Sequence, residues 1–258
     1  MRLTRKNTYV LSLFLLLIPA SARSEEDTWT TTLGGGLTVR PTFEGSDRYT
    51  VSPAPLVVIV WNDMLALDDK GLNGYWHREN LRIGGGLTYD SGRREKEELF
   101  SQGDGRLRGL GNIDGALGLR AFASYDFGPV LVEGAAIKFT GTDNKGVLTD
   151  LVASIPYRPS RKLSIRPLLG ATWADDRYMR TFFGVTAMQS ASSGFAPFHA
   201  GAGFKSFTAG VKFAYLFNPH WMLLGGAHIE QLTGDGGKSP IVFSKTGALF
   251  TVMLGYNF

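Results

Sequence analysis

The stretch GALFTVMLGYNF, Gly247–Phe258, alternates between two kinds of residue along its whole length. Every second position is apolar and the series ends in aromatic residues, whereas the positions between them are mixed and include small and polar groups. Because side chains of a β-strand point alternately to opposite faces, the pattern predicts a strand with one face in lipid and the other in a lumen. The apolar face consists of Ala248, Phe250, Val252, Leu254, Tyr256 and Phe258.

The same stretch resembles the C-terminal insertion signal of Gram-negative outer-membrane barrels, which closes with an aromatic residue, usually Phe. A strand of a soluble sandwich can show the same alternation, but it has no reason to end the chain on an exposed Phe258. We therefore expect a C-terminal insertion signal formed by Phe250, Val252, Leu254, Tyr256 and Phe258.

Similar segments recur upstream, and together they predict an all-β fold, a single antiparallel transmembrane barrel of about 12 strands, or about 10 if weak strands are misread. Charged residues of these segments fall on the second face, where a wet lumen would spare them the need for protein partners. They are Arg82, Arg120, Arg166, Lys212 and Glu230. The predicted strands are 28–40, 51–61, 64–70, 72–77, 81–90, 113–127, 129–139, 146–157, 163–173, 205–217, 220–231 and 247–258.

The connections between these segments fall into two classes, as in outer-membrane barrels, where short periplasmic turns alternate with longer extracellular loops. Three long polar stretches stand out, Ser91–Asn112, Ala174–Phe204 and Thr233–Thr246. Splitting residues 64–76 at Asp68–Gly71 gives an even strand number and puts all three long stretches on the outside.

Residues 1–22 are predicted to be a Sec-type signal peptide, with the barrel spanning 23–258. Arg2, Arg5 and Lys6 precede an apolar run, and a small-residue cleavage site ends at Ala22. No apolar run after Ala22 approaches the roughly 20 residues that a membrane-spanning helix needs, since the longest is Leu56–Trp61.

Composition removes several function classes. The chain has 27 Lys and Arg against 23 Asp and Glu, and three of the cations lie in the predicted signal, so the mature net charge is close to neutral. This balance argues against nucleic-acid binding, which needs a clustered cationic face. The chain has no Cys, and its four His show no zinc-binding spacing, so no metal and no cofactor are expected.

Three weaker features of the sequence could carry chemistry. His228 and Glu230 share the lumen face and could act as a base and its partner, but a solvated pair is the better interpretation. Asp175–Arg177 could hold a hard cation, although a self-neutralised loop cluster is favoured. Gly234–Ser239 resembles the end of a phosphate-binding loop but lacks its first glycine, because residue 232 is Leu. We expect no catalytic residues.

Three other segments resemble motifs of the MltA-interacting protein family (MipA/OmpV). Ala174–Thr186, ADDRYMRTFFGVT, is similar to the family's A-D-D-x-Y-M signature, and Gly109–Asp114, GLGNID, is similar to a second motif. Pro41–Asp47, PTFEGSD, resembles a third motif beside the first hairpin. The resemblance extends over essentially the whole chain after the signal.

The resemblance implies a non-enzymatic outer-membrane barrel. It implies a scaffold whose partners are a lytic murein transglycosylase and a bifunctional penicillin-binding protein, in addition to outer-membrane lipid. Alternatives within the family are an osmoregulated, porin-like diffusion channel and a surface adhesin. No site residues carry over from the family, so a docking surface is predicted from the basic residues of two short turns, Arg158, Arg161, Lys162 and His220.

Overall fold

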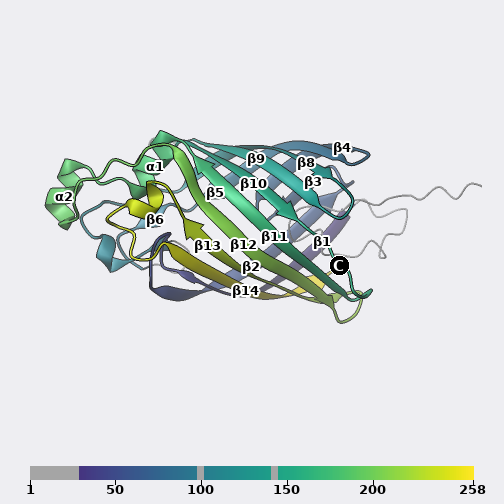
Figure 1. Ribbon diagram of the computed structural model, residues 1–258. Helices are drawn as coiled ribbons and strands as arrows, with labels where there is room; N and C mark the ends of the chain where they lie inside the picture. The colour runs from purple at the N-terminus through teal and green to yellow at the C-terminus, as the bar shows by residue number, and fades with distance from the viewer. Residues whose placement is uncertain (1–28, 98–101, 141–144) are drawn as a thin grey trace, which may run out of the picture.

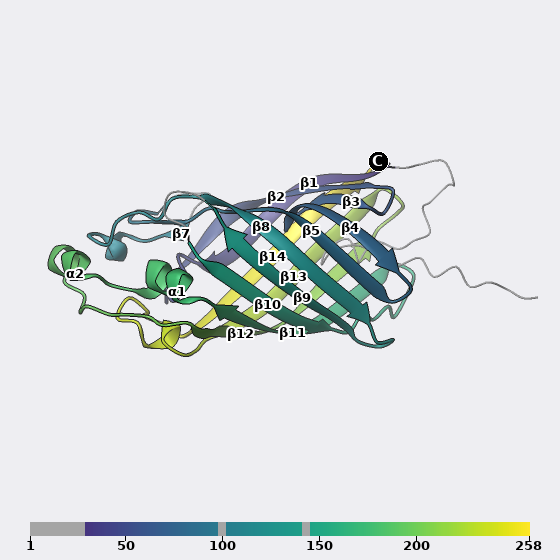
Figure 2. The same ribbon diagram turned by 90° about the horizontal axis from the view of Figure 1, so that it is seen from above.

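Twelve antiparallel strands close into a barrel in the computed structural model, which describes residues 29–97, 102–140 and 145–258. Each strand pairs with its neighbour along the chain, and the last pairs with the first (Figures 1 and 2). The barrel strands are β1 (Trp29–Pro41), β2 (Tyr49–Trp61), β3 (Leu65–Asp68), β4 (Gly71–Arg78), β5 (Leu81–Asp90), β8 (Ala116–Asp126), β9 (Leu131–Phe139), β10 (Val147–Ser154), β11 (Leu163–Ala174), β12 (Gly203–Leu216), β13 (Trp221–Leu232) and β14 (Thr246–Asn257).

The predicted strand number and the predicted split of residues 64–76 are confirmed. The chain turns at Asp68–Gly71, so that β3 and β4 form a short hairpin. The predicted signal peptide, residues 1–22, lies outside the described residues. Among the helices of the described ranges, none has the length and apolar character to cross a membrane.

The predicted faces of β14 are also confirmed. Phe250, Val252 and Leu254 are 51%, 53% and 44% exposed on the outside of the barrel, whereas Met253 between them is buried. The outer surface is consequently an apolar belt that suits a lipid environment. Across most of the circumference, strand pairing also leaves no backbone edge exposed to lipid.

The lumen near the short turns is packed with side chains. Inward-facing apolar residues form a core there. Buried polar side chains such as Arg120, Ser124 and Arg166 lie in the same half of the barrel. The core comprises Leu56, Val58, Val60, Ala66, Tyr75, Phe122, Ala135, Ala214, Met222, Leu224 and Met253.

Glycines let β1 approach its neighbour closely where the barrel closes. A Cβ atom on Gly34 would lie 2.0 Å from the carbonyl oxygen of Leu254, and one on Gly36 would lie 1.9 Å from that of Val252. The segment Ile83–Thr88, IGGGLT, nearly repeats Leu33–Thr38, LGGGLT, and a Cβ atom on its Gly86 would lie 2.3 Å from the carbonyl oxygen of Leu72. Both segments reflect tight strand geometry, because glycine in a strand permits such close backbone approach.

The long connections gather at one end of the barrel and the short turns at the other, together with the C-terminus (Figure 1). The stretch 174–204, predicted to be a polar loop, contains two helices, α1 (Asp176–Phe183) and α2 (Ala187–Ser193). The stretch 91–112 contains two short parallel strands, β6 (Arg93–Arg94) and β7 (Gln102–Gly103). Both helices begin at capping side chains, Asp175 and Thr186, which explains why a polar stretch still becomes helical.

Candidate functional site

The long connections fold over the barrel mouth and pack into two apolar clusters. In the first cluster, α1 turns Tyr178, Met179 and Phe183 inward against strand residues. The second joins Phe43 of the β1–β2 connection to Leu107 and Ile241 of two other long connections. Three segments far apart in the sequence are thereby held as one cap.

A polar network holds the same cap together around Arg106. Its guanidinium donates to Asp104 Oδ2 at 2.9 Å and to Asp47 Oδ1 at 2.6 Å, and it lies 4.0 Å from the ring centroid of Phe243. The hydrogen bond from Arg106 holds the pKa of Asp47 below its ordinary value. Burial raises the pKa of Asp104, but hydrogen bonds from Arg106 and Thr42 outweigh it and lower the pKa overall.

Arg93 fixes the β5–β8 connection to α1. Its guanidinium is buried and donates to the carbonyl oxygen of Phe182 at 2.6 Å. Burial lowers the pKa of Arg93 to about 10, so it keeps its charge at neutral pH. The segments that resembled family motifs therefore meet here, since Pro41–Asp47, Gly109–Asp114 and Ala174–Thr186 all contribute to the cap.

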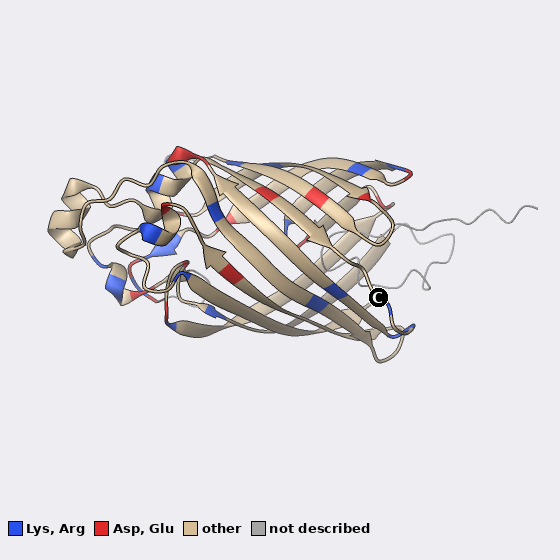
Figure 3. Ribbon diagram, in the orientation of Figure 1, with Lys and Arg blue, Asp and Glu red and all other residues tan. Residues whose placement is uncertain are grey.

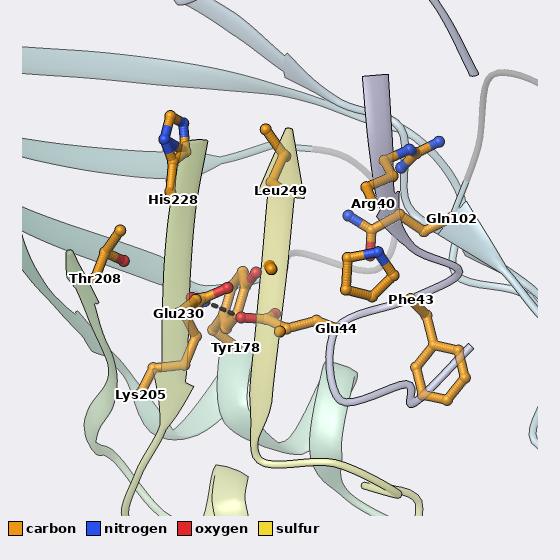
Figure 4. Close-up of a pocket in the computed structure, with 13 residues that line it drawn as sticks. Arg40, Phe43, Glu44, Gln102, Tyr178, Lys205, Thr208, His228, Glu230 and Leu249 are labelled. Carbon is orange, nitrogen blue, oxygen red and sulfur yellow. Dashed lines mark hydrogen bonds and ion pairs between the residues drawn. The ribbon is translucent and has the colours of Figure 1, made fainter. Parts of the chain in front are cut away.

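Beneath the cap lies a cavity of about 360 Å³ whose wall contains two carboxylates on either side of one lysine (Figure 4). Lys205 of β12 contacts Glu44 of the β1–β2 connection and also donates to Glu230 Oε1 at 3.1 Å. Burial raises the pKa of Glu44 to about 7, with a further contribution from Glu230 and opposition from Lys205. The cavity thus carries one ion-pair centre that can gain or lose a proton near neutral pH.

A second cavity of about 480 Å³ continues toward the middle of the barrel. The two cavities share Arg40, His228 and Leu249 as wall residues. The second cavity reaches Leu56, Val58 and Met253 of the apolar core, so its floor is apolar.

His228 and Glu230 do not pair as a general base and its carboxylate partner. Within the described residues, His228 Nδ1 is buried without a hydrogen-bond partner, and Glu230 bonds to Lys205. Figure 4 shows the imidazole directed away from the two carboxylates. The arrangement therefore offers no oriented histidine base.

Arg120, one of the charged residues on the lumen face, has protein partners. This differs from the expectation that a wet lumen would make such partners unnecessary. Arg120 Nη2 donates to Glu133 Oε1 at 2.8 Å, and Lys70 Nζ donates to the same oxygen at 2.5 Å. Arg120 also donates to Asn73 Oδ1 at 3.2 Å. Because these side chains converge from β4, β8, β9 and the β3–β4 turn, they fill this side of the lumen. Figure 3 shows acidic and basic residues both represented along the barrel strands.

The segments Asp175–Arg177 and Gly234–Ser239 have structural roles. Asp175 Oδ1 accepts a hydrogen bond from Tyr178 N at 2.8 Å as the α1 N-cap, and Asp176 pairs with Arg180 at 2.5 Å rather than with Arg177. Over the described ranges, no group of His, Cys, Asp or Glu is arranged to hold a metal ion. Gly236–Lys238 forms a short 3₁₀ turn within the long polar stretch between β13 and β14.

The predicted docking residues lie in two neighbouring turns at the barrel end that carries the C-terminus. Arg158, Arg161 and Lys162 belong to the exposed β10–β11 turn, and the carbonyl oxygen of Lys162 accepts from Leu216 N at 2.8 Å. His220 in the β12–β13 turn accepts through its carbonyl oxygen from Asn257 N at 2.7 Å. The four residues thus flank the ends of β11, β12 and β14.

Sequence reasoning missed the residues at the centre of the cap cavity, Glu44, Lys205 and Tyr178. Glu44 and Tyr178 both lie inside segments that resembled family motifs, but no spacing rule connects them to Lys205, which is 161 residues from Glu44. The resemblance to family motifs was the feature of the sequence that could have identified Glu44 and Tyr178.

Comparison with known proteins gives a family match over most of the chain. The family model described as "MltA-interacting protein MipA" matches residues 33–258. The "MltA-interacting protein" of Escherichia coli strain K12 is 21% identical over 199 residues, covering 77% of this chain and 72% of that protein. The protein of the same name from Shigella flexneri matches equally.

The comparison with solved structures matches outer-membrane proteins at low similarity. OmpT of Vibrio cholerae is 8% identical with a TM-score of 0.41, and the match covers 91% of this chain and 99% of that chain. The channel DcaP of Acinetobacter baumannii is also 8% identical with a TM-score of 0.41, covering 89% of this chain and 96% of that chain.

Proposed function

Because the chain belongs to the family of MltA-interacting protein MipA, we propose that it is a non-enzymatic outer-membrane barrel that docks a lytic murein transglycosylase. The observation that carries the proposal is the family match over residues 33–258, together with relatives named for that interaction. In the fuller form of the proposal, the barrel is a scaffold that also holds a bifunctional penicillin-binding protein.

The proposed docking surface is the periplasmic patch, defined as Arg158, Arg161, Lys162 and His220. Its support is that the paired strands β11 and β12 bring the two turns side by side and that the four residues are exposed. Three side chains of like charge at a barrel end favour a partner with an acidic surface, since complementary charge steers association. Short turns offer little area, so we expect a weak complex with fast exchange.

The test is capture of a purified lytic transglycosylase by the full barrel in detergent. Replacing Arg158, Arg161 and Lys162 together by Ser should reduce capture and should make the remaining capture less sensitive to salt than that of the wild type. The matched control replaces three exposed cations of the opposite end, Arg108, Arg177 and Lys238, by Ser. Equal capture by the two triple variants would reject the patch, and no capture by the wild type above an unrelated barrel would reject docking altogether.

A small diffusion channel is the second candidate, because two adjacent cavities that share wall residues occupy the loop-side part of the lumen. The apolar core below them argues for a closed state, since an apolar constriction excludes water and ions. Planar-bilayer recordings decide between the channel and the scaffold. We expect no steady conductance from the wild type and measurable steps after Met222→Ala combined with Met253→Ala. Steady wild-type conductance would favour the channel over the scaffold.

A further inference from the structure

The barrel wall is incomplete between β2 and β5 on the side of the long connections. β2 runs from Tyr49 to Trp61, but its ladder with β3 covers only Ile59–Trp61. The β3–β4 hairpin turns back at Asp68–Gly71, far short of Tyr49. Within the described strands, residues 49–58 of β2 therefore pair with β1 alone and leave one edge open, which we call the β2 notch.

Two prolines lie in the β2 notch. Pro53 and Pro55 are exposed on the outer face and pair with Leu37 and Gly35 of β1. Proline has no backbone N–H to donate, so within a sheet it is found essentially at edges. The sequence is thus adapted to a permanent edge at this point of the wall, rather than to a strand that has lost its neighbour.

The larger cavity extends to this notch. Its wall contains the outward-facing Pro53 and Pro55 as well as the inward-facing Thr251 and Met253. A single space of about 480 Å³ therefore touches both the lumen and the open edge of β2. The cap lies above it and the apolar core lies below it, so the notch is the direct side route into the cavity.

The cavity combines an apolar floor with charged side chains. Leu56, Val58 and Met253 make its floor apolar. Among the described residues that line it, Arg40 and Lys212 contribute positive charge and Asp69 contributes the one carboxylate. Lys212 is only 5% exposed, so its ammonium group acts inside the lumen and not at the membrane surface.

We propose that the β2 notch is a lateral entrance through which a long-chain carboxylate passes from the lipid phase and is held in the lumen cavity. Its carboxylate would lie near Lys212 and Arg40, and its alkyl chain would extend over Pro53 and Pro55 into the bilayer. The excess of positive charge selects an anion, and the continuity of the cavity with the apolar exterior selects a molecule with a lipid-soluble tail. The proposal requires the bilayer location but not docking of a murein enzyme.

The experiment uses the full barrel in phosphatidylcholine vesicles and a dansyl-labelled undecanoate as the probe. Energy transfer from tryptophan to dansyl should saturate with wild-type protein. The methyl ester of the probe should bind about tenfold more weakly, because it lacks the charge that pairs with lysine. Butyrate should not compete, because it has no tail to occupy the notch. Competition by butyrate equal to that by unlabelled undecanoate would replace lateral entry with a water-accessible anion site.

Two pairs of variants separate head-group binding from entry. Lys212→Met should weaken probe binding about tenfold, while Lys212→Arg should stay close to wild type. Pro55→Trp should block the notch and slow probe entry, whereas the matched control Leu117→Trp, on the outer face of β8, should not. Folding of each variant is verified by its heat-modifiable gel shift. If Lys212→Met does not fold, Arg40→Gln takes its place.

Absence of saturable binding by the wild type would overturn the proposal. So would folded Lys212→Met with unchanged affinity, or Pro55→Trp with the entry rate of Leu117→Trp. Capture of the transglycosylase in the separate docking experiment would be unaffected by any of these results, so the failure of one proposal remains distinguishable from the failure of the other.

Discussion

The backbone amide of Phe258 donates a hydrogen bond of 3.0 Å to the carbonyl oxygen of Thr31. The residue after β14 is thereby joined to the first barrel strand, and the ladder continues from Thr32 with Asn257 to Val39 with Phe250. The first and last strands thereby close the barrel. This closure matters because an open edge in hydrocarbon would leave several backbone groups without partners.

Removal of Phe258 is predicted to reduce assembly. The terminal aromatic is the part of the segment that resembles an insertion signal, so folded protein in outer-membrane fractions should fall sharply. The heat-modifiable gel shift measures the folded fraction. Phe258→Trp keeps an aromatic side chain and should assemble close to the wild-type level. Equal folded fractions for the deletion and the wild type would contradict a signal role for Phe258.

Arginine substitutions on opposite faces of β14 are predicted to differ in cost. Val252 lies midway along the strand and faces outward, so Val252→Arg should destabilise the barrel by roughly 2–4 kcal/mol if it lies at the bilayer midplane. Thr251→Arg should cost less, because Thr251 lines the larger cavity. Urea unfolding in vesicles measures both. Similar losses for the two variants would show that the lipid and lumen faces are assigned incorrectly.

Neutralising Glu133 is predicted to destabilise the lumen. Glu133→Gln removes the carboxylate that both Lys70 and Arg120 contact, and leaving a buried ion pair without one partner costs about 3 kcal/mol. The control is Asp114→Asn, which breaks the more exposed pair with Arg94 and should cost less than about 1 kcal/mol. Both free energies of unfolding come from urea titration. A loss for Glu133→Gln no larger than that for Asp114→Asn would mean that the lumen network adds little.

The cap is predicted to loosen as pH rises through the range in which Glu44 titrates. The pKa of Glu44 is raised from 4.5 to about 7 in the folded cap, so the folded state binds this proton more tightly than the opened state. The contribution is therefore most favourable below pH 4.5 and is lost progressively as pH rises toward 7. Hydrogen exchange of amides in residues 42–47 measures the opening.

The control for this pH effect is a matched pair of variants. Glu44→Gln should flatten the pH dependence between 4.5 and 7. Asp47→Asn should keep it, because the pKa of Asp47 is already lowered by Arg106 and lies outside that window. Identical pH profiles for the wild type and Glu44→Gln would show that another group controls the cap.

Much of the fold followed from the sequence because alternation of side-chain polarity is a local property of a strand. Phe250, Val252 and Leu254 could be assigned to the lipid face without knowing their neighbours, since each strand in a barrel meets the same two environments. The even strand number and the position of the long connections followed from the turn residues around Asp68. The helices α1 and α2 were missed because they span only eight and seven residues, and helix caps such as Asp175 act over only a few residues.

The contents of the lumen were decided by the tertiary structure. Leu56, Val58 and Val60 lie in a run that is apolar on both faces, so alternation could not reveal that its inner face forms a core. Glu133 meets Lys70 from 63 residues away, and Glu44 meets Lys205 from 161 residues away. Such contacts depend on the registers of many strand pairs around a closed wall. The sequence alone therefore determined which faces meet lipid, while closure of the barrel decided which inward-facing groups meet each other, because only a closed sheet brings distant strands across one lumen.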